Sequence, residues 1–144
     1  AMNDVLLNDV KQVDADLYLQ THSTNPLLRA ETVCAAIDTF VGRRDEFDSL
    51  FSVTRLQTRL WTGDRKPINH DPAVLLRTQD LPPVYEENSC LYLFSRAGLE
   101  RFGNRIGERP LLFETTPEEA WDIDEELDFA IAEFLYARRA GSGT

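Results

Sequence analysis

The sequence predicts a single α/β domain, residues 1–144, built on a largely parallel sheet. Stretches with helical periodicity alternate with short apolar stretches typical of strands, which is the pattern of a layered α/β protein. A chain of 144 residues can bury one hydrophobic core but is too short for two ordinary domains. No repeat or low-complexity segment interrupts this pattern.

The first third of the chain supplies two helices and two strands. Residues 5–13 have mild helical periodicity and precede a short strand at residues 16–20. A clear helix is expected at residues 30–40, because its apolar residues recur at helical spacing and so lie on one face. That face consists of Val33, Ala36, Ile37 and Phe40. Residues 49–53 form the next strand.

The middle of the chain, residues 54–88, predicts an extended arm. It carries prolines at positions 67, 72, 82 and 83 and turn signals at Gly63-Asp64 and Asn69, so we expect at most one hairpin there. Irregular segments of this length inside a small domain are usually functional or packed against another chain. We therefore expect the arm to take part in a homodimer.

The last third returns to alternating strands and helices. Residues 89–94 are the clearest strand of the sequence, residues 97–102 a short helix and residues 110–113 another strand. An amphipathic helix follows Asp124 and runs to about Arg139.

Composition excludes several functions. The chain has 15 basic and 25 acidic residues, a formal net charge of -10, which argues against a nucleic-acid partner. It has no apolar run long enough to span a membrane and no secretory signal at its start. Cys34 and Cys90 lie in apolar contexts without metal-ligand spacing, which predicts buried, reduced thiols in a cytoplasmic protein. His22 and His70 are not expected to bind metal.

Asp122-Ile123-Asp124, directly before the last helix, is the strongest local indication of chemistry. In extended backbone the two carboxylates point the same way, and a pair of hard oxygen donors suits Mg²⁺ bound together with substrate phosphates. The alternative is structural. Asp122 with Glu125 fits a capping box, and Asp124 is itself a good N-cap.

Four segments, in order, resemble the acylneuraminate cytidylyltransferases, which make CMP-sugars from CTP and a sugar acid. Residues 18–26 (Tyr-Leu-Gln-Thr-His-Ser-Thr-Asn-Pro) are similar to the family's Leu-Gln-x-Thr-Ser-Pro. Residues 77–82 (Arg-Thr-Gln-Asp-Leu-Pro) resemble Arg-Arg-Gln-Asp-Leu-Pro, and residues 87–93 (Glu-Asn-Ser-Cys-Leu-Tyr-Leu) resemble Asn-Gly-Ala-Ile-Tyr-Ile. Residues 121–128 (Trp-Asp-Ile-Asp-Glu-Glu-Leu-Asp) resemble Asp-Ile-Asp-Thr-x-x-Asp.

The resemblance implies a nucleotidyltransferase-like, Rossmann-like fold and roles for individual residues. Gln20 matches the glutamine that contacts the sugar acid. Asp122 and Asp124 match the catalytic aspartates that hold Mg²⁺ against the CTP phosphates. Asn88 and Tyr92 match residues of the sugar pocket. The structural alternatives are that Gln20 ends a strand, Asn88 occupies a turn and Tyr92 belongs to the core.

Arg77 is the residue expected near the sugar carboxylate, because a guanidinium can bind a carboxylate through two hydrogen bonds. Here the sequence departs from the family, which often has a second arginine where this chain has Thr78. Ser89 stands where the family usually has glycine, which changes the wall of the pocket.

A phosphate-binding loop rich in glycine is missing from the front of the sequence, since the first glycine is Gly42. We therefore expect a chain that begins within the family fold, lacks the N-terminal strands and the CTP-binding loop, and is inactive alone. The intact enzyme would transfer CMP to an acidic sugar by attack of a sugar hydroxyl on the α-phosphorus, with pyrophosphate leaving. The alternatives are a non-catalytic dimerisation or sugar-acid-binding module and, less favoured, an unrelated Mg²⁺ hydrolase.

Overall fold

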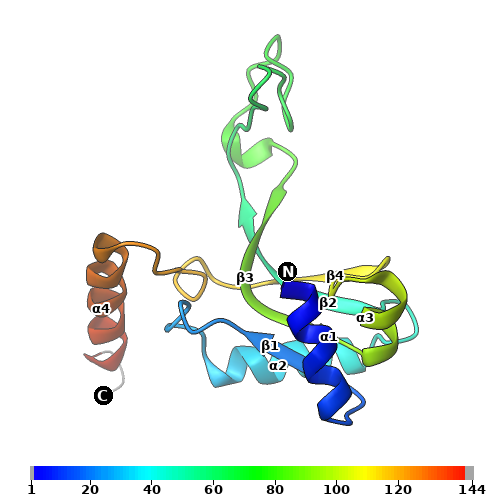
Figure 1. The fold of residues 1–144 in the computed structure, drawn as a ribbon. Coiled ribbons are helices and arrows are strands. Elements are labelled where there is room, and N and C mark those ends of the chain that lie inside the picture. Colours follow the sequence, from blue (N-terminus) through cyan, green and yellow to red (C-terminus); the bar gives the residue numbers. More distant parts are fainter. Residues whose placement is uncertain (1, 142–144) are drawn as a thin grey trace.

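The computed structural model describes residues 2–141 and contains every helix and strand that the sequence predicts (Figure 1). The helices are α1 (Met2–Gln12), α2 (Ala30–Val41), α3 (Arg96–Phe102) and α4 (Glu126–Gly141), with a 3₁₀ turn η1 at Thr78–Asp80. The strands are β1 (Tyr18–Thr21), β2 (Ser49–Leu56), β3 (Val84–Phe94) and β4 (Pro110–Glu114). The largest difference from expectation is β3, which begins at Val84, before the predicted residue 89.

The sheet is open and mixed rather than largely parallel. Its strand order is β1-β3-β2-β4, and only β2 and β4 form a parallel pair. The expectation of a largely parallel sheet was wrong. β3 returns from the arm, lies between β1 and β2, and pairs antiparallel with both. β1, β2 and β4 nevertheless run in one direction, so their carboxyl ends meet at one edge.

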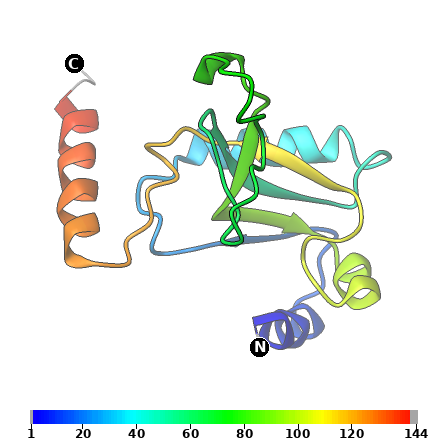
Figure 2. The ribbon, with the colours of Figure 1, turned by 90° about the horizontal axis from the view of Figure 1, so that it is seen from above.

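Helices cover both faces of the sheet, as Figure 2 shows. On one face, Ala36 and Phe40 of α2 pack against the buried leucines Leu50, Leu91 and Leu93. Ala36 and Phe40 belong to the apolar stripe that the sequence predicts for residues 30–40. The helix buries this stripe against the sheet, as an amphipathic helix should. On the other face, α1 and α3 pack against the sheet in a second cluster. Its buried members are Leu6, Val10, Tyr92, Phe94 and Leu99.

A bulge in β3 interrupts its pairing with β2. Phe51 pairs with Tyr92 but Val53 pairs with Glu87, so β3 contains extra residues at this point. Within the bulge Ser89 has a φ of 61°, in the left-handed region where glycine is favoured. This conformation is the physical reason why a glycine suits the position and why serine is strained there.

The arm projects away from the sheet between β2 and β3 (Figure 1). Its tip is the expected hairpin, with a bridge between Trp61 and Pro67 and a hydrogen bond of 2.9 Å from Ile68 N to Leu60 O. Leu75 on the arm is 91% exposed. A role of the arm in a homodimer remains a prediction.

The two cysteines differ from expectation in burial. Both are free, but only Cys90 is buried, whereas Cys34 is exposed. The prediction for Cys34 was wrong because the residue lies beside, not on, the apolar stripe of α2, whose buried residues are Ala36 and Phe40. None of the helices within residues 2–141 combines the length and apolar character needed to cross a bilayer.

Candidate functional site

The candidate site lies at the edge of the sheet where β1, β2 and β4 end, the edge at which open α/β sheets bind ligands. After β4 the chain passes along this edge to the segment that follows β1. Ile123 N donates a hydrogen bond of 2.9 Å to Thr24 O, and Asn25 Nδ2 donates one of 3.4 Å to Trp121 O. These bonds place the Asp122–Asp124 segment beside the residues that follow Gln20.

Asp122 and Asp124 line one cavity of about 340 Å³ together with Thr54 and Glu86. Both side chains are exposed, and neither carboxylate has a hydrogen bond or ion pair among residues 2–141. The helix is capped instead by Asp128, whose Oδ2 accepts from Asp124 N at 3.2 Å and from Glu125 N at 3.0 Å. With capping assigned to Asp128, both aspartates remain available to a ligand.

The donor set of this cavity fits Mg²⁺. Two carboxylates without other partners offer hard oxygen ligands, and Mg²⁺ commonly takes only one or two from the protein, with water and substrate phosphates supplying the rest. Within the described part of the chain, no group of three or more His, Cys, Asp or Glu is arranged to hold a metal ion. A site complete without substrate is therefore not present in residues 2–141.

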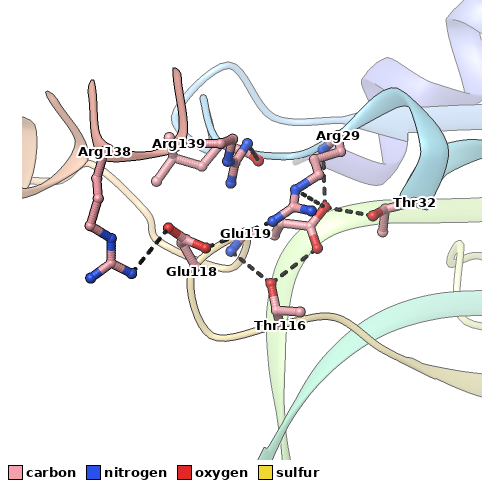
Figure 3. Close-up of polar contacts among 8 residues, drawn as sticks. Arg29, Thr32, Thr116, Glu118, Glu119, Arg138 and Arg139 are labelled. Carbon is pink, nitrogen blue, oxygen red and sulfur yellow. Dashed lines mark hydrogen bonds and ion pairs between the residues drawn. The ribbon is translucent and has the colours of Figure 1, made fainter. Parts of the chain in front are cut away.

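Glu119 anchors the segment that carries the two aspartates, a role that sequence reasoning missed (Figure 3). Its side chain is buried, with 3% of the residue exposed. Oε1 accepts from Thr32 Oγ1 at 2.5 Å and from Arg29 N at 3.1 Å, and Oε2 accepts from Thr116 Oγ1 at 3.0 Å. Burial alone would raise the pKa of Glu119, but these hydrogen bonds outweigh burial and hold the pKa below its ordinary value.

Gln20 and Tyr92 lie side by side, as paired residues of β1 and β3. Tyr92 is fully buried, and its hydroxyl donates to Glu87 and lies 3.1 Å from Ser89 Oγ. Burial, followed by the hydrogen bond to Glu87, raises the pKa of Tyr92. Arg105, which sequence reasoning also missed, joins the pair by donating from Nη1 to Gln20 Oε1 at 2.6 Å.

Asn88 sits in the bulge and uses both ends of its amide within the protein. Nδ2 donates to Thr54 Oγ1 at 3.0 Å and to Thr115 Oγ1 at 2.8 Å. Oδ1 accepts from Ser52 Oγ at 2.6 Å and from Cys90 N at 3.3 Å. Asn88 thus fastens β3 to β2 and to the end of β4, and its expected contact with the sugar remains a prediction.

Arg77 lies in the arm, immediately before η1, and the structure does not bring it to the other candidate residues. Its side chain is 73% exposed and forms an ion pair with Asp80, with Nε 2.7 Å from Oδ2. This pair occupies the guanidinium edge that the expected sugar carboxylate would need.

Comparisons with known proteins point to one family. A family model described as cytidylyltransferase matches residues 1–139. The chain is 29% identical over 127 residues to the N-acylneuraminate cytidylyltransferase of Oncorhynchus mykiss, covering 83% of this chain and 28% of that protein. It is 26% identical over 141 residues to the post-translational flagellin modification protein B of Campylobacter coli, covering 93% of this chain and 59% of that protein.

A shorter match of 40% identity over 57 residues, 40% of this chain and 24% of the relative, links it to the CMP-N,N'-diacetyllegionaminic acid synthase of Campylobacter jejuni. The chain therefore spans between 24% and 59% of the length of these relatives.

Proposed function

The chain belongs to the cytidylyltransferase family, and from this premise we propose that it is part of an enzyme that transfers CMP from CTP to an acidic sugar of the sialic acid kind, releasing pyrophosphate. The observation that carries the proposal is the pair Asp122 and Asp124, which line one cavity at the carboxyl edge of the sheet and whose carboxylates have no partner among residues 2–141. The names of the relatives supply the substrate class.

In this proposal Asp122 and Asp124 hold Mg²⁺. When bound there, Mg²⁺ would offset the negative charge of the triphosphate and of the departing pyrophosphate. The residues of the chain position the substrates. Glu119 and the Thr24–Ile123 hydrogen bond fix the aspartates, and Gln20 faces the sugar.

A second candidate function is a non-catalytic module that dimerises through the arm and keeps only the binding sites. The observation that favours it is the set of exposed apolar residues on the arm, which an interface would cover. They are Trp61, Ile68, Val74, Leu75 and Leu76. The transferase needs a bound metal and a nucleotide for its activity, whereas the non-catalytic module needs neither.

The test compares Asp124→Asn with Glu125→Gln, a matched control that removes one charge from the neighbouring exposed residue. Mn²⁺ binding is measured by electron paramagnetic resonance, binding of N-acetylneuraminic acid by calorimetry, and pyrophosphate release in the presence of CTP and MgCl₂. We expect Asp124→Asn to weaken Mn²⁺ binding about tenfold or more, as removal of a ligand should, and Glu125→Gln to change it less than about twofold.

The outcomes separate the functions. Binding of the sugar acid, with metal binding that depends on Asp124, supports the proposal, and pyrophosphate release shows that this chain suffices for the transfer. Sugar-acid binding with no metal dependence at Asp124 supports the non-catalytic module instead. A chain that binds neither the sugar acid nor the metal contradicts the proposal.

A further inference from the structure

Arg105 lies in a short, hydrogen-bonded turn between α3 and β4. The turn runs from Gly103 to Gly107, which have φ of 68° and 74°. Asn104 Oδ1 accepts hydrogen bonds of 2.9 Å from the backbone N–H groups of Ile106 and Gly107. At Gly107, whose φ is positive, an added Cβ would lie 2.4 Å from Asp48 Oδ1, so the position requires glycine as the turn stands.

The turn presents the Arg105 guanidinium to the two sugar-pocket candidates. Its Cζ lies 3.4 Å from the centre of the buried Tyr92 ring, a stacked cation–π contact, and Nη1 donates to Gln20 Oε1. Because a guanidinium has no acceptor, this bond turns the amide oxygen of Gln20 toward Arg105, while Gln20 Nε2 lies on the other side, 3.4 Å from His22 Nε2. Contacts with β1, through Gln20, and with β3, through Tyr92, thus fix the position of the Arg105 side chain.

The remaining edge of the guanidinium has no protein partner. Among residues 2–141, Nε and Nη2 of Arg105 make no hydrogen bond, are not sealed from water, and have no carboxylate within ion-pair distance. Other arginines of this acidic chain, such as Arg29, Arg43 and Arg77, are paired with carboxylates. A half-buried guanidinium with a free fork and no counter-ion is a receptor for an anion, above all for a planar carboxylate.

A cavity beside Gln20, the hydrogen-bond partner of Arg105, suits a sugar. The cavity, of about 260 Å³, is lined by Met2, by Gln20 and by the four residues that follow Gln20, which carry three hydroxyl groups and an imidazole. They are Thr21, His22, Ser23 and Thr24. Hydroxyl-rich walls match a polyhydroxylated ring. Thr24, one of the lining residues, accepts a hydrogen bond from the backbone N–H of Ile123, which stands between the two metal-binding candidates in the sequence.

We propose that Arg105, and not Arg77, binds the carboxylate of the acidic sugar and thereby makes the site selective for sugar acids over neutral sugars. The proposal rests on the function proposed above, since it names the contact that would recognise that substrate. Arg105 also acts as a positioning residue, because it orients the amide of Gln20.

The experiment measures two ligands against three variants by calorimetry. The ligands are N-acetylneuraminic acid and its methyl ester, which is neutral but otherwise alike. The variants are Arg105→Ala, Arg105→Lys and, as matched control, Arg101→Ala. Arg101 is an exposed arginine whose guanidinium likewise lies over an aromatic ring, that of Phe102. Far- and near-ultraviolet circular dichroism verifies that each variant is folded.

We expect Arg105→Ala to weaken binding of the acid about 10- to 100-fold, the loss of a charge-assisted bidentate pair, and to change binding of the ester less than about threefold. The preference of the wild-type chain for the acid should disappear in this variant. Arg105→Lys, which keeps the charge but not the fork, should retain part of the preference. Arg101→Ala should bind both ligands as the wild type does.

Two results would overturn the inference. Equal weakening of acid and ester by Arg105→Ala would show that Arg105 only supports Tyr92 and Gln20. Unchanged binding of the acid would show that another residue meets the carboxylate. In both cases the wild-type chain still binds the sugar acid, so the proposed function survives. If the wild type binds neither ligand, the proposed function itself fails, and the inference falls with it.

Discussion

Replacing Glu119 by glutamine tests whether this buried carboxylate holds the aspartate segment in place. Thr32, the Arg29 backbone and Thr116 each donate one hydrogen bond to it. Hydrogen bonds to a charged acceptor contribute about 1.5–3 kcal/mol, against about 0.5–1.5 kcal/mol for neutral ones, so three bonds together lose about 3–4.5 kcal/mol. Relief from burying a charge returns part of this, and we expect a net loss of about 2 kcal/mol.

The assay is thermal and urea unfolding of Glu119→Gln beside Glu118→Gln. A loss of about 2 kcal/mol lowers Tm by about 4–8 °C. Glu118 is the matched control, because it is the adjacent glutamate. Its ion pairs with residues 2–141 are longer, 3.7 Å to Arg29 and 3.9 Å to Arg138 (Figure 3), and each contributes at most about 1 kcal/mol. A loss at Glu119 no larger than that at Glu118 refutes the reasoning.

The same variant has a pH signature. The pKa of Glu119 is lower in the folded protein than in the unfolded chain, where a glutamate titrates near about 4.3. Its contribution to stability is therefore complete above that value and is lost as the pH falls through the lower, folded pKa. The gap between wild type and Glu119→Gln should be full at neutral pH and close in acid. A gap that widens in acid contradicts the assigned direction of the shift.

Three further predictions concern the bulge, the cysteines and the arm. Ser89→Gly should be about 1 kcal/mol more stable than Ser89→Ala in urea unfolding, because only glycine adopts a φ of 61° without strain; equal stabilities would contradict this. A thiol reagent at about pH 8 should label the exposed Cys34 rapidly and leave Cys90 unlabelled, because burial raises the pKa of Cys90 to about 11. Rapid labelling of the Cys34→Ser variant would contradict this prediction. Leu75→Glu should shift the chain toward monomer in sedimentation velocity, and a dimer that survives this change would exclude the exposed apolar part of the arm as its interface.

The elements of the fold could be predicted because their signals are local. The stripe of apolar residues that predicts α2 lies within about two helical turns, and Ala36 and Phe40 of this stripe are buried. Strand order carries no such signal. The insertion of β3 between β1 and β2 depends on how the arm returns, and nothing in the composition of residues 89–94 indicates an antiparallel strand.

In the candidate site, too, the residues with a local sequence signal could be predicted and those with distant partners could not. The common direction of Asp122 and Asp124 could be expected from their spacing, and both line one cavity. Glu119 was missed because its partner Thr32 is 87 residues away in sequence. Arg105 was missed because it lies in a loop without periodicity, although the two glycines that bracket it, Gly103 and Gly107, are a sequence signal for a tight turn presenting a side chain.

The arm is joined to the candidate metal cavity by strands β2 and β3. β2 and β3 run from the core to the base of the arm, and beyond the bulge Thr54 pairs with Glu86, two residues that line the cavity with Asp122 and Asp124. The same pair of strands therefore continues into the arm at one end and forms one wall of the cavity at the other. A molecule that bound the arm would therefore act on the same two strands that carry Thr54 and Glu86 into the cavity wall.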